Sequence, residues 1–268
     1  MELDGRTVLI TGGGTGIGRE LALVLAGKGA RLVLTGRRPE PLAETARLVE
    51  AVGARVRTVA GDVGDADHRR AALTEAERAF GGLDVLVNNA GNVAAGRLDS
   101  ISEEEVRAMI EVNLVAPILL TRAALPLLRA SGDGLVVNVA SGIALVAMPF
   151  YGVYAAAKGG LSQFGEALRR ELSGEGVRVM TAYPAATETA MMASSKIGGE
   201  HGVVRESPQS VAAAIVEGME ADALRVVGGG EARMALIALN NTEPEKVDAV
   251  FAGKKAAIEA AVSAHRSL

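Results

Sequence analysis

The sequence predicts an α/β protein built on a doubly wound parallel sheet. Short apolar, β-branched runs alternate with stretches of helical apolar spacing along most of the chain. Strands that are apolar throughout, rather than at every second position, indicate a sheet covered by helices on both faces. No linker, repeat or shift in composition divides the 268 residues, so we expect a single domain.

Seven strands and the helices between them can be placed from local patterns. Two helix starts are marked, one by Pro39 and one by a capping box of Ser102 with Glu105. The expected strands are 7–11, 31–35, 55–60, 83–88, 135–140, 177–183 and 224–227. The expected helices are 16–28, 39–52, 66–80, 102–130, 151–172 and one from 208, followed by 232–239 and 244–264.

Composition excludes several classes of site. The chain has no cysteine, so disulfides, thiolate metal sites and a cysteine nucleophile are excluded. The three histidines, His68, His201 and His265, are too scattered for metal-ligand spacing, so no metal is expected. The net charge of −4 argues against a nucleic-acid partner. No apolar run reaches the ~18 residues of a membrane helix. The N-terminus also lacks the pattern of a secretory signal, so we expect a cytoplasmic protein with no membrane span.

A glycine-rich turn joins the first strand to the first helix. Residues 11–18 are Thr-Gly-Gly-Gly-Thr-Gly-Ile-Gly, a T-G-x-x-x-G-x-G pattern with Gly12, Gly16 and Gly18. Such a turn lets the backbone approach a pyrophosphate, which then lies on the helix N-terminus. The alternative is a tight turn with close helix packing and no ligand. The strand–turn–helix context near the N-terminus favours a dinucleotide.

Tyr154 and Lys158 are four residues apart in a predicted helix, so they share one face. An ammonium beside a phenol favours the phenolate and lowers the tyrosine pKa, which suits a proton-transfer pair. The alternative is an amphipathic surface pair. Tyr151 is a competing phenol, but the residue four after it is Ala155, so it lacks a lysine partner. We expect Tyr151 to form a wall of the substrate pocket or to serve packing alone.

Taken together, five motifs resemble the short-chain dehydrogenase/reductase family. They are the turn 11–18, the segment Asn88-Asn-Ala-Gly91, Asn113, Ser141 and the pair Tyr154-x-x-x-Lys158. The resemblance covers roughly residues 5–228. It implies a seven-stranded Rossmann sheet and a nicotinamide cofactor that exchanges hydride with a carbonyl or a secondary alcohol. Residues 1–230 would form the dinucleotide-binding and catalytic domain, and residues 231–268 would be its C-terminal helical extension.

The resemblance also implies the catalytic roles. Tyr154 would be the general acid/base, and Lys158 would lower its pKa and hold the nicotinamide ribose. Ser141, just past the fifth strand, would hydrogen-bond the substrate oxygen, with a helix or turn cap as the alternative. Asn113 would hold a water in a proton relay to the lysine, with a bond to a neighbouring helix carbonyl as the alternative.

The end of the second strand bears on the choice of cofactor. Enzymes that prefer NAD place an acidic residue there to accept hydrogen bonds from the ribose 2′-hydroxyl. Here Gly36 stands at that position and Arg37 and Arg38 follow, and an arginine can clamp a 2′-phosphate. We therefore expect NADP(H) in preference to NAD(H), with solvated loop arginines as the alternative. The whole expected cofactor site is Gly12, Thr15, Gly16, Ile17, Gly18, Arg37, Arg38, Asp62, Val63, Asn89, Ala90, Gly91, Tyr154, Lys158, Pro184, Thr187 and Thr189.

The substrate is defined only as a small-molecule carbonyl or alcohol. The expected pocket residues are Val93, Ile143, Tyr151 and Met191. Residues 190–206, which are polar with a few apolar points, are expected to form a mobile lid in which His201 is a solvated loop residue. Rival functions are an NAD-dependent alcohol or polyol dehydrogenase, a 3-oxoacyl thioester reductase, a non-catalytic NADP(H)-binding regulator and an interaction protein.

The predicted helices 102–130 and 151–172 offer a face for a homodimer or homotetramer. Small residues at 155–157 with Gly159 and Gly160 would let helices approach closely. The two helices after residue 230 depart from the commonest family pattern. They are expected to cover the sheet edge, to pack over the substrate cleft or to pair with another subunit.

Overall fold

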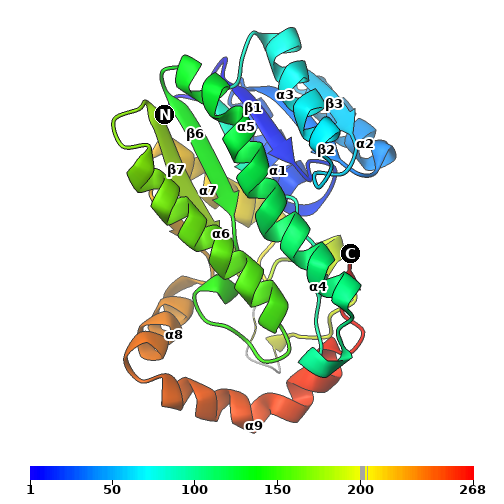
Figure 1. Cartoon of the computed structure of the whole chain (residues 1–268), viewed down its shortest axis with the longest axis vertical. Helices are drawn as coiled ribbons and strands as arrows, with labels where there is room; N and C mark the ends of the chain where they lie inside the picture. Colours follow the sequence, from blue (N-terminus) through cyan, green and yellow to red (C-terminus); the bar gives the residue numbers. More distant parts are fainter. Residues whose placement is uncertain (200–202, 204) are drawn as a thin grey trace.

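The computed structural model describes residues 1–199, 203 and 205–268, and it confirms the doubly wound parallel sheet (Figure 1). Seven strands lie in the order β3-β2-β1-β4-β6-β7-β8, and all six pairings are parallel. The strands are β1 Thr7–Thr11, β2 Arg31–Gly36, β3 Val56–Ala60, β4 Val85–Asn88, β6 Gly134–Val139, β7 Val177–Tyr183 and β8 Arg225–Val227. Each lies within two residues of its predicted bounds.

Two apolar layers sandwich the sheet. Successive side chains of one strand point to opposite faces of the sheet: Val8 and Ile10 pack with one set of helices, and Leu9 packs with the other. The first set is α1 Gly16–Gly27, α2 Pro39–Ala51 and α7 Pro208–Glu220. The second set is α3 Ala66–Phe80, α5 Ala116–Ala130 and α6 Gly152–Glu171. This double coverage is why the strands are apolar on both faces.

The order of the strands places a crevice at the carboxyl edge of the sheet. The chain first steps from β1 to β3 in one direction and then from β4 to β8 in the other. The reversal falls between β1 and β4, which pair with Ile10 opposite Val87. In open α/β sheets, ligands bind outside the carboxyl ends of the strands at such a reversal. The loops after β1, β4, β6 and β7 therefore surround the expected site.

The predicted helix over 102–130 is interrupted. It consists of α4 Glu103–Ile110, a π-helical turn η2 Glu111–Val115 and α5. The amide Nδ2 of Asn113 donates to the carbonyl of Met109, four residues earlier, at 2.9 Å. In a regular α-helix the Met109 carbonyl would accept a hydrogen bond from the backbone N–H of Asn113. The Asn113 side chain competes for that carbonyl, and such competition widens the helical turn.

By length and composition the region Glu103–Ala130 would also pass as a membrane span, with a mean hydropathy of 1.5 in its most apolar window. Core helices of soluble proteins pass the same test, and Leu120, Ala124 and Leu128 of this region pack on the sheet.

The C-terminal residues pack over the carboxyl edge of the sheet. Helices α8 Gly230–Thr242 and α9 Pro244–Val262 run as an arch along one end of the molecule and lead back toward α4 (Figure 1). The short strand β9 Arg266–Ser267 then pairs antiparallel with β5 Val93–Ala94, and Arg266 Nε lies 2.6 Å from Glu105 Oε1. Of the three arrangements expected for this segment, the structure shows the one over the cleft. The remaining short helical turns are η1 Leu98–Ser100, η3 Gly142–Ala144 and η4 Ala190–Met192.

Candidate active site

The glycine-rich turn after β1 is built around backbone that only glycine tolerates easily. Gly12 and Gly16 have φ of +67° and +55°, in the left-handed region. A Cβ on Gly18 would lie 2.6 Å from Asn89 Nδ2 and 2.9 Å from the carbonyl carbon of Gly12. The N-terminus of α1 therefore sits directly on the turn, and its free N–H groups face the cavity at the carboxyl edge.

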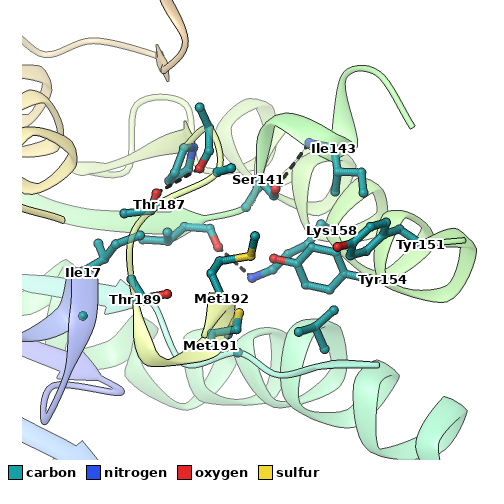
Figure 2. A pocket seen from close by; sticks show the side chains of 18 of the residues that line it. Ile17, Ser141, Ile143, Tyr151, Tyr154, Lys158, Thr187, Thr189, Met191 and Met192 are labelled. Atoms are coloured by element: carbon teal, nitrogen blue, oxygen red, sulfur yellow. Dashed lines mark hydrogen bonds between the residues drawn. The ribbon is translucent and has the colours of Figure 1, made fainter. Parts of the chain in front are cut away.

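Tyr154 and Lys158 face the same cavity from the first turns of α6 (Figure 2). Lys158 is 4% exposed, and its Nζ donates to the carbonyl of Val139 at the end of β6, at 2.9 Å. The same Nζ lies 5.9 Å from the centre of the Tyr154 ring. The helical spacing predicted from the sequence thus brings the two side chains together, and β6 fixes the lysine.

Burial shifts the pKa values of both side chains. Burial raises the pKa of Tyr154 to about 12, with the Ser141 hydroxyl acting in the opposite direction. Burial also lowers the pKa of Lys158 to about 8. The expectation that Lys158 lowers the tyrosine pKa stays a prediction: the largest influence on the Tyr154 pKa is desolvation of the phenolate, and the Lys158 ammonium is directed at the carbonyl of Val139. At neutral pH Tyr154 is therefore protonated, and it lies beside a mostly charged ammonium.

Ser141 lies just after β6 and lines the cavity with Tyr154. Its Oγ accepts a hydrogen bond from the backbone N–H of Ile143 at 3.3 Å, so it caps the short turn η3. The capping alternative is thus realised, and because the cap uses only a lone pair of Oγ, the hydroxyl proton can still be donated to a group in the cavity. Both expected roles are compatible with this geometry.

Asn113 lies behind the cavity rather than in its lining. The residue is fully buried, and its Nδ2 donates to Asn92 and Met109. Its Oδ1 has no partner among the described residues, and a Cβ on Gly91 would lie 2.9 Å from that oxygen and 3.6 Å from Lys158 Nζ. A buried, unpartnered acceptor near the lysine is the feature that a water-mediated relay requires.

A second cavity adjoins the turn on the side of β2 and β3. Gly36, Arg37, Arg38, Asp62 and Val63 all line it, as predicted. A Cβ on Gly36 would find nothing closer than 3.8 Å, so the end of β2 leaves open space. No acidic side chain stands at this position, and two arginines flank it.

The other predicted site residues divide into two groups. Gly18 and Asn113 are not among the lining residues of either cavity: Gly18 packs against the turn, and Asn113 lies behind Gly91, so a direct cofactor contact by Gly18 stays a prediction. Asn89 also supports the turn, because its Nδ2 donates to Thr11 O at 2.9 Å. The remaining residues line the main cavity: Gly12, Thr15, Gly16, Ile17, Asn89, Ala90, Gly91, Pro184, Thr187, Thr189, Val93, Ile143, Tyr151 and Met191.

Of the segment 190–206, the residues that line this cavity are Ala190, Met191, Met192, Ile197 and Val203. Met191 and Met192 face Tyr154 and Lys158 (Figure 2). Residues 200–202 and 204, which include His201, lie outside the described part of the chain. The expectation that the segment moves as a lid stays a prediction.

Two ionisable residues that line the cavity in the described part of the chain were not predicted, and both come from the C-terminal residues 231–268. Arg233 of α8 and His265 before β9 line the main cavity together with Ser141 and Tyr151. His265 is fully buried, its ring lies 5.9 Å from that of Tyr151, and burial lowers its pKa to about 4. No local motif marks either residue, since their place depends on the path of α8 and α9.

The glycine-rich turn after β1 lies in one cavity with the Tyr154–Lys158 pair, at the carboxyl edge of the sheet. Comparison with known proteins decides the family. A family model described as short chain dehydrogenase matches residues 6–198. The chain belongs to the short-chain dehydrogenase/reductase family. Members of the family are NAD(P)-dependent oxidoreductases, so this chain is a dehydrogenase/reductase enzyme.

Individual relatives are spread over several activities. A ketoacyl reductase, HetN, of Nostoc sp. is 31% identical over 93% of this chain and 89% of its own. The putative oxidoreductase SadH of Mycobacterium tuberculosis is 34% identical over 86% of this chain and 88% of its own. An Arabidopsis thaliana 11-beta-hydroxysteroid dehydrogenase 1A is 36% identical over 74% of this chain and 57% of its own.

A solved structure shows the same fold. A short-chain dehydrogenase/reductase from Burkholderia phymatum, in complex with NAD, superposes with a TM-score of 0.84 at 27% identity and covers 91% of this chain and 96% of its own. The two adjoining cavities described here fit such a dinucleotide. The turn and α1 N-terminus would hold its pyrophosphate, the β2–β3 side its adenosine, and Lys158 its nicotinamide ribose.

Proposed function

We propose that this enzyme reduces a small-molecule ketone or aldehyde with NADP(H), and oxidises the corresponding secondary alcohol in reverse. The observation that supports this proposal is the partly buried phenol of Tyr154 beside Lys158, in the cavity that also contains Ser141 and the glycine turn. Burial raises the pKa of that phenol to about 12, so it is neutral at pH 7. A neutral phenol is the form that a carbonyl reductase needs for its acid step.

Each of the four residues Ser141, Tyr154, Lys158 and Asn113 has its own role in the reduction. The reduced nicotinamide, when bound, supplies hydride to the carbonyl carbon. Ser141 Oγ donates a hydrogen bond to the carbonyl oxygen and orients it toward Tyr154. Tyr154 gives its phenolic proton to that oxygen, and the Lys158 ammonium stabilises the phenolate left behind. Asn113 Oδ1 would hold the water through which the phenol is reprotonated, because this oxygen and Lys158 Nζ both lie close to Gly91.

A turnover screen tests the proposal. Purified protein should consume NADPH with at least one member of a panel of aliphatic, cyclic and acidic ketones and aldehydes. The loss of nicotinamide absorbance measures this consumption. One alcohol should form per NADPH consumed. Tight NADPH binding without turnover across the panel would instead support the non-catalytic regulator.

We further propose that NADP(H) is preferred, on the basis of the open end of β2 at Gly36 and the two arginines after it. Gly36→Asp should lower the ratio of NADPH to NADH kcat/KM by about 10- to 100-fold, because a carboxylate there repels a 2′-phosphate and accepts from a 2′-hydroxyl. Arg37→Gln should lower kcat/KM with NADPH and leave NADH little changed. Steady-state kinetics with both cofactors measure this, and an unchanged ratio in both variants would refute the preference.

The pH dependence of reduction should follow Lys158 and not a histidine. With its pKa lowered to about 8, Lys158 is charged below that value and loses its proton above it. We expect kcat/KM for reduction to be flat near neutral pH and to fall by up to about tenfold per unit above pH 8. The buried His265 has a pKa of about 4, so it adds no step near 6.5. A decline centred near pH 6.5 would contradict this assignment.

A homodimer or homotetramer built on α5 and α6 is part of the same proposal. Ile118 and Leu119 of α5 and Phe164 of α6 are only half-buried in the single chain. Light scattering on the purified protein checks the assembly. The expected cytoplasmic location stays a prediction that cell fractionation would check.

A further inference from the structure

Arg233 brings a positive charge into a cavity whose walls are largely apolar. The side chain is half-buried on α8, and the cavity that it lines also contains Ile143, Met148, Met191 and Ile197. Desolvation lowers the pKa of its guanidinium, which means that the charged form has lost hydration without gaining a compensating charge. Among the residues that the structure describes, its buried Nε has no hydrogen-bond partner, and no ion pair includes it.

Two glycines, Gly142 and Gly229, leave the room that the Arg233 side chain occupies. A Cβ on Gly142 would lie 3.0 Å from Arg233 Cζ and 3.1 Å from Nε. At the base of the side chain, Gly229 has φ of +90°, and a Cβ there would lie 2.8 Å from Arg233 Cβ. Gly142 directly follows Ser141, and consecutive Cα atoms are about 3.8 Å apart. The guanidinium therefore packs against the residue that follows Ser141, and Ser141 and Arg233 line the same cavity.

Other charged groups around the cavity are already engaged. Lys158 Nζ donates to Val139 O at 2.9 Å, and Arg205 donates to the carbonyls of Ser195 and Ile197 at 2.8 Å. The carboxylate of Glu206 accepts from the backbone N–H of Gly229 at 2.7 Å.

His265 adds no charge at neutral pH, because burial lowers its pKa to about 4. Its Nδ1 lies 3.1 Å from Ser194 Oγ, and its buried Nε2 has no partner among the described residues. The imidazole is thus a neutral hydrogen-bonding point on the cavity wall, and Arg233 is left as the cation available to a substrate.

We propose that Arg233 binds a carboxylate on the substrate, so that the enzyme acts on oxo acids and the corresponding hydroxy acids. The planar guanidinium matches a carboxylate in two parallel hydrogen bonds. The closeness of Gly142 to Ser141 places that carboxylate a few bonds from the reacting carbonyl. The reaction balances as oxo acid plus NADPH plus H⁺ giving hydroxy acid plus NADP⁺. This inference rests on the proposed function and names its substrate class.

The test compares acids with neutral counterparts in which only the charge differs. The panel holds 2-, 3- and 4-oxo acids of one carbon chain, the methyl ester of each, and a phosphorylated ketone of similar size. We expect the wild type to have a kcat/KM about 10- to 100-fold higher for the best acid than for its ester, the usual effect of a hydrogen-bonded charge pair.

Substitution of Arg233 should remove this discrimination. Arg233→Gln should lower kcat/KM for the acid by about 10- to 100-fold, mainly through KM, and change the ester less than about threefold. Arg233→Lys should recover part of the loss, because it restores the charge without the paired geometry. The matched control is Arg225→Gln, which removes an exposed arginine that pairs with Glu166 and should behave as wild type. Cofactor affinity, measured by NADPH fluorescence, should be the same in all four proteins.

The outcomes separate this inference from the proposed function. No turnover of any carbonyl would refute the function itself. Turnover of esters and acids alike, or an Arg233→Gln loss that is equal for both, would overturn the carboxylate role and leave the reductase intact. A clear preference for the phosphorylated ketone would overturn the carboxylate in favour of a phosphate. Weaker NADPH binding in Arg233→Gln would assign the arginine to the cofactor and overturn the inference.

Discussion

Replacing Tyr154 with phenylalanine should reduce kcat by about 100- to 10,000-fold, the usual contribution of a positioned general acid. The change removes one oxygen and leaves the ring, which packs 6.5 Å from Tyr151 between ring centres, so the cavity keeps its shape. No other phenol adjoins Lys158 in the described site, and water cannot replace an acid that is held in place. Single-turnover reduction of the best carbonyl measures the chemical step directly.

Tyr151→Phe is the matched control for this experiment. Tyr151 is buried on the wall of the same cavity, with its ring tilted against that of His265, but no lysine lies four residues after it. We expect a change in kcat below about tenfold, since packing is retained and no proton donor is lost. NADPH binding should persist in both variants. Robust turnover by Tyr154→Phe, or a collapse in Tyr151→Phe alone, would exchange the roles of the two phenols.

The fold, and the positions of Tyr154, Lys158 and the glycine turn in it, were predictable because they depend on short-range patterns. The alternation of apolar strands and helices places the sheet, and the spacing of Tyr154 and Lys158 depends only on one helical turn. The glycine turn is similarly local, because Gly12 and Gly16 need positive φ whatever the rest of the chain does. These features can be predicted without any knowledge of tertiary contacts.

What escaped prediction depends on tertiary packing. Arg233 and His265 reach the cavity only because α8 and α9 arch over it and β9 pairs with β5. The π-helical turn at Asn113 arises from a side-chain bond to Met109, which helical periodicity does not reveal. The rise of the Tyr154 pKa has the same origin, since burial is a property of the packed site.

Gly18→Ala should damage both the cofactor site and stability. Gly18 is buried in the first turn of α1, and a Cβ there would press on Asn89 and on the backbone of Gly12, which cannot swing away as a side chain tip can. The helix would have to lift off the turn, which misplaces the N–H groups that would hold a pyrophosphate. We expect NADPH binding to weaken roughly 10- to 100-fold, as for the loss of a charge-assisted hydrogen bond. Overpacking of this kind should also lower the free energy of unfolding by about 1–3 kcal/mol.

The same helix offers an internal control in Gly27→Ala. Gly27 ends α1 on the exposed side, and an added Cβ there would meet nothing within 4 Å. Alanine should leave NADPH binding unchanged and raise the free energy of unfolding by up to about 1 kcal/mol, because it reduces the entropy of the unfolded chain. NADPH titration and urea unfolding of the two variants measure both effects. If Gly18→Ala bound NADPH as well as Gly27→Ala does, close contact between α1 and the turn would not be needed, and the small residue at 18 would serve helix packing alone.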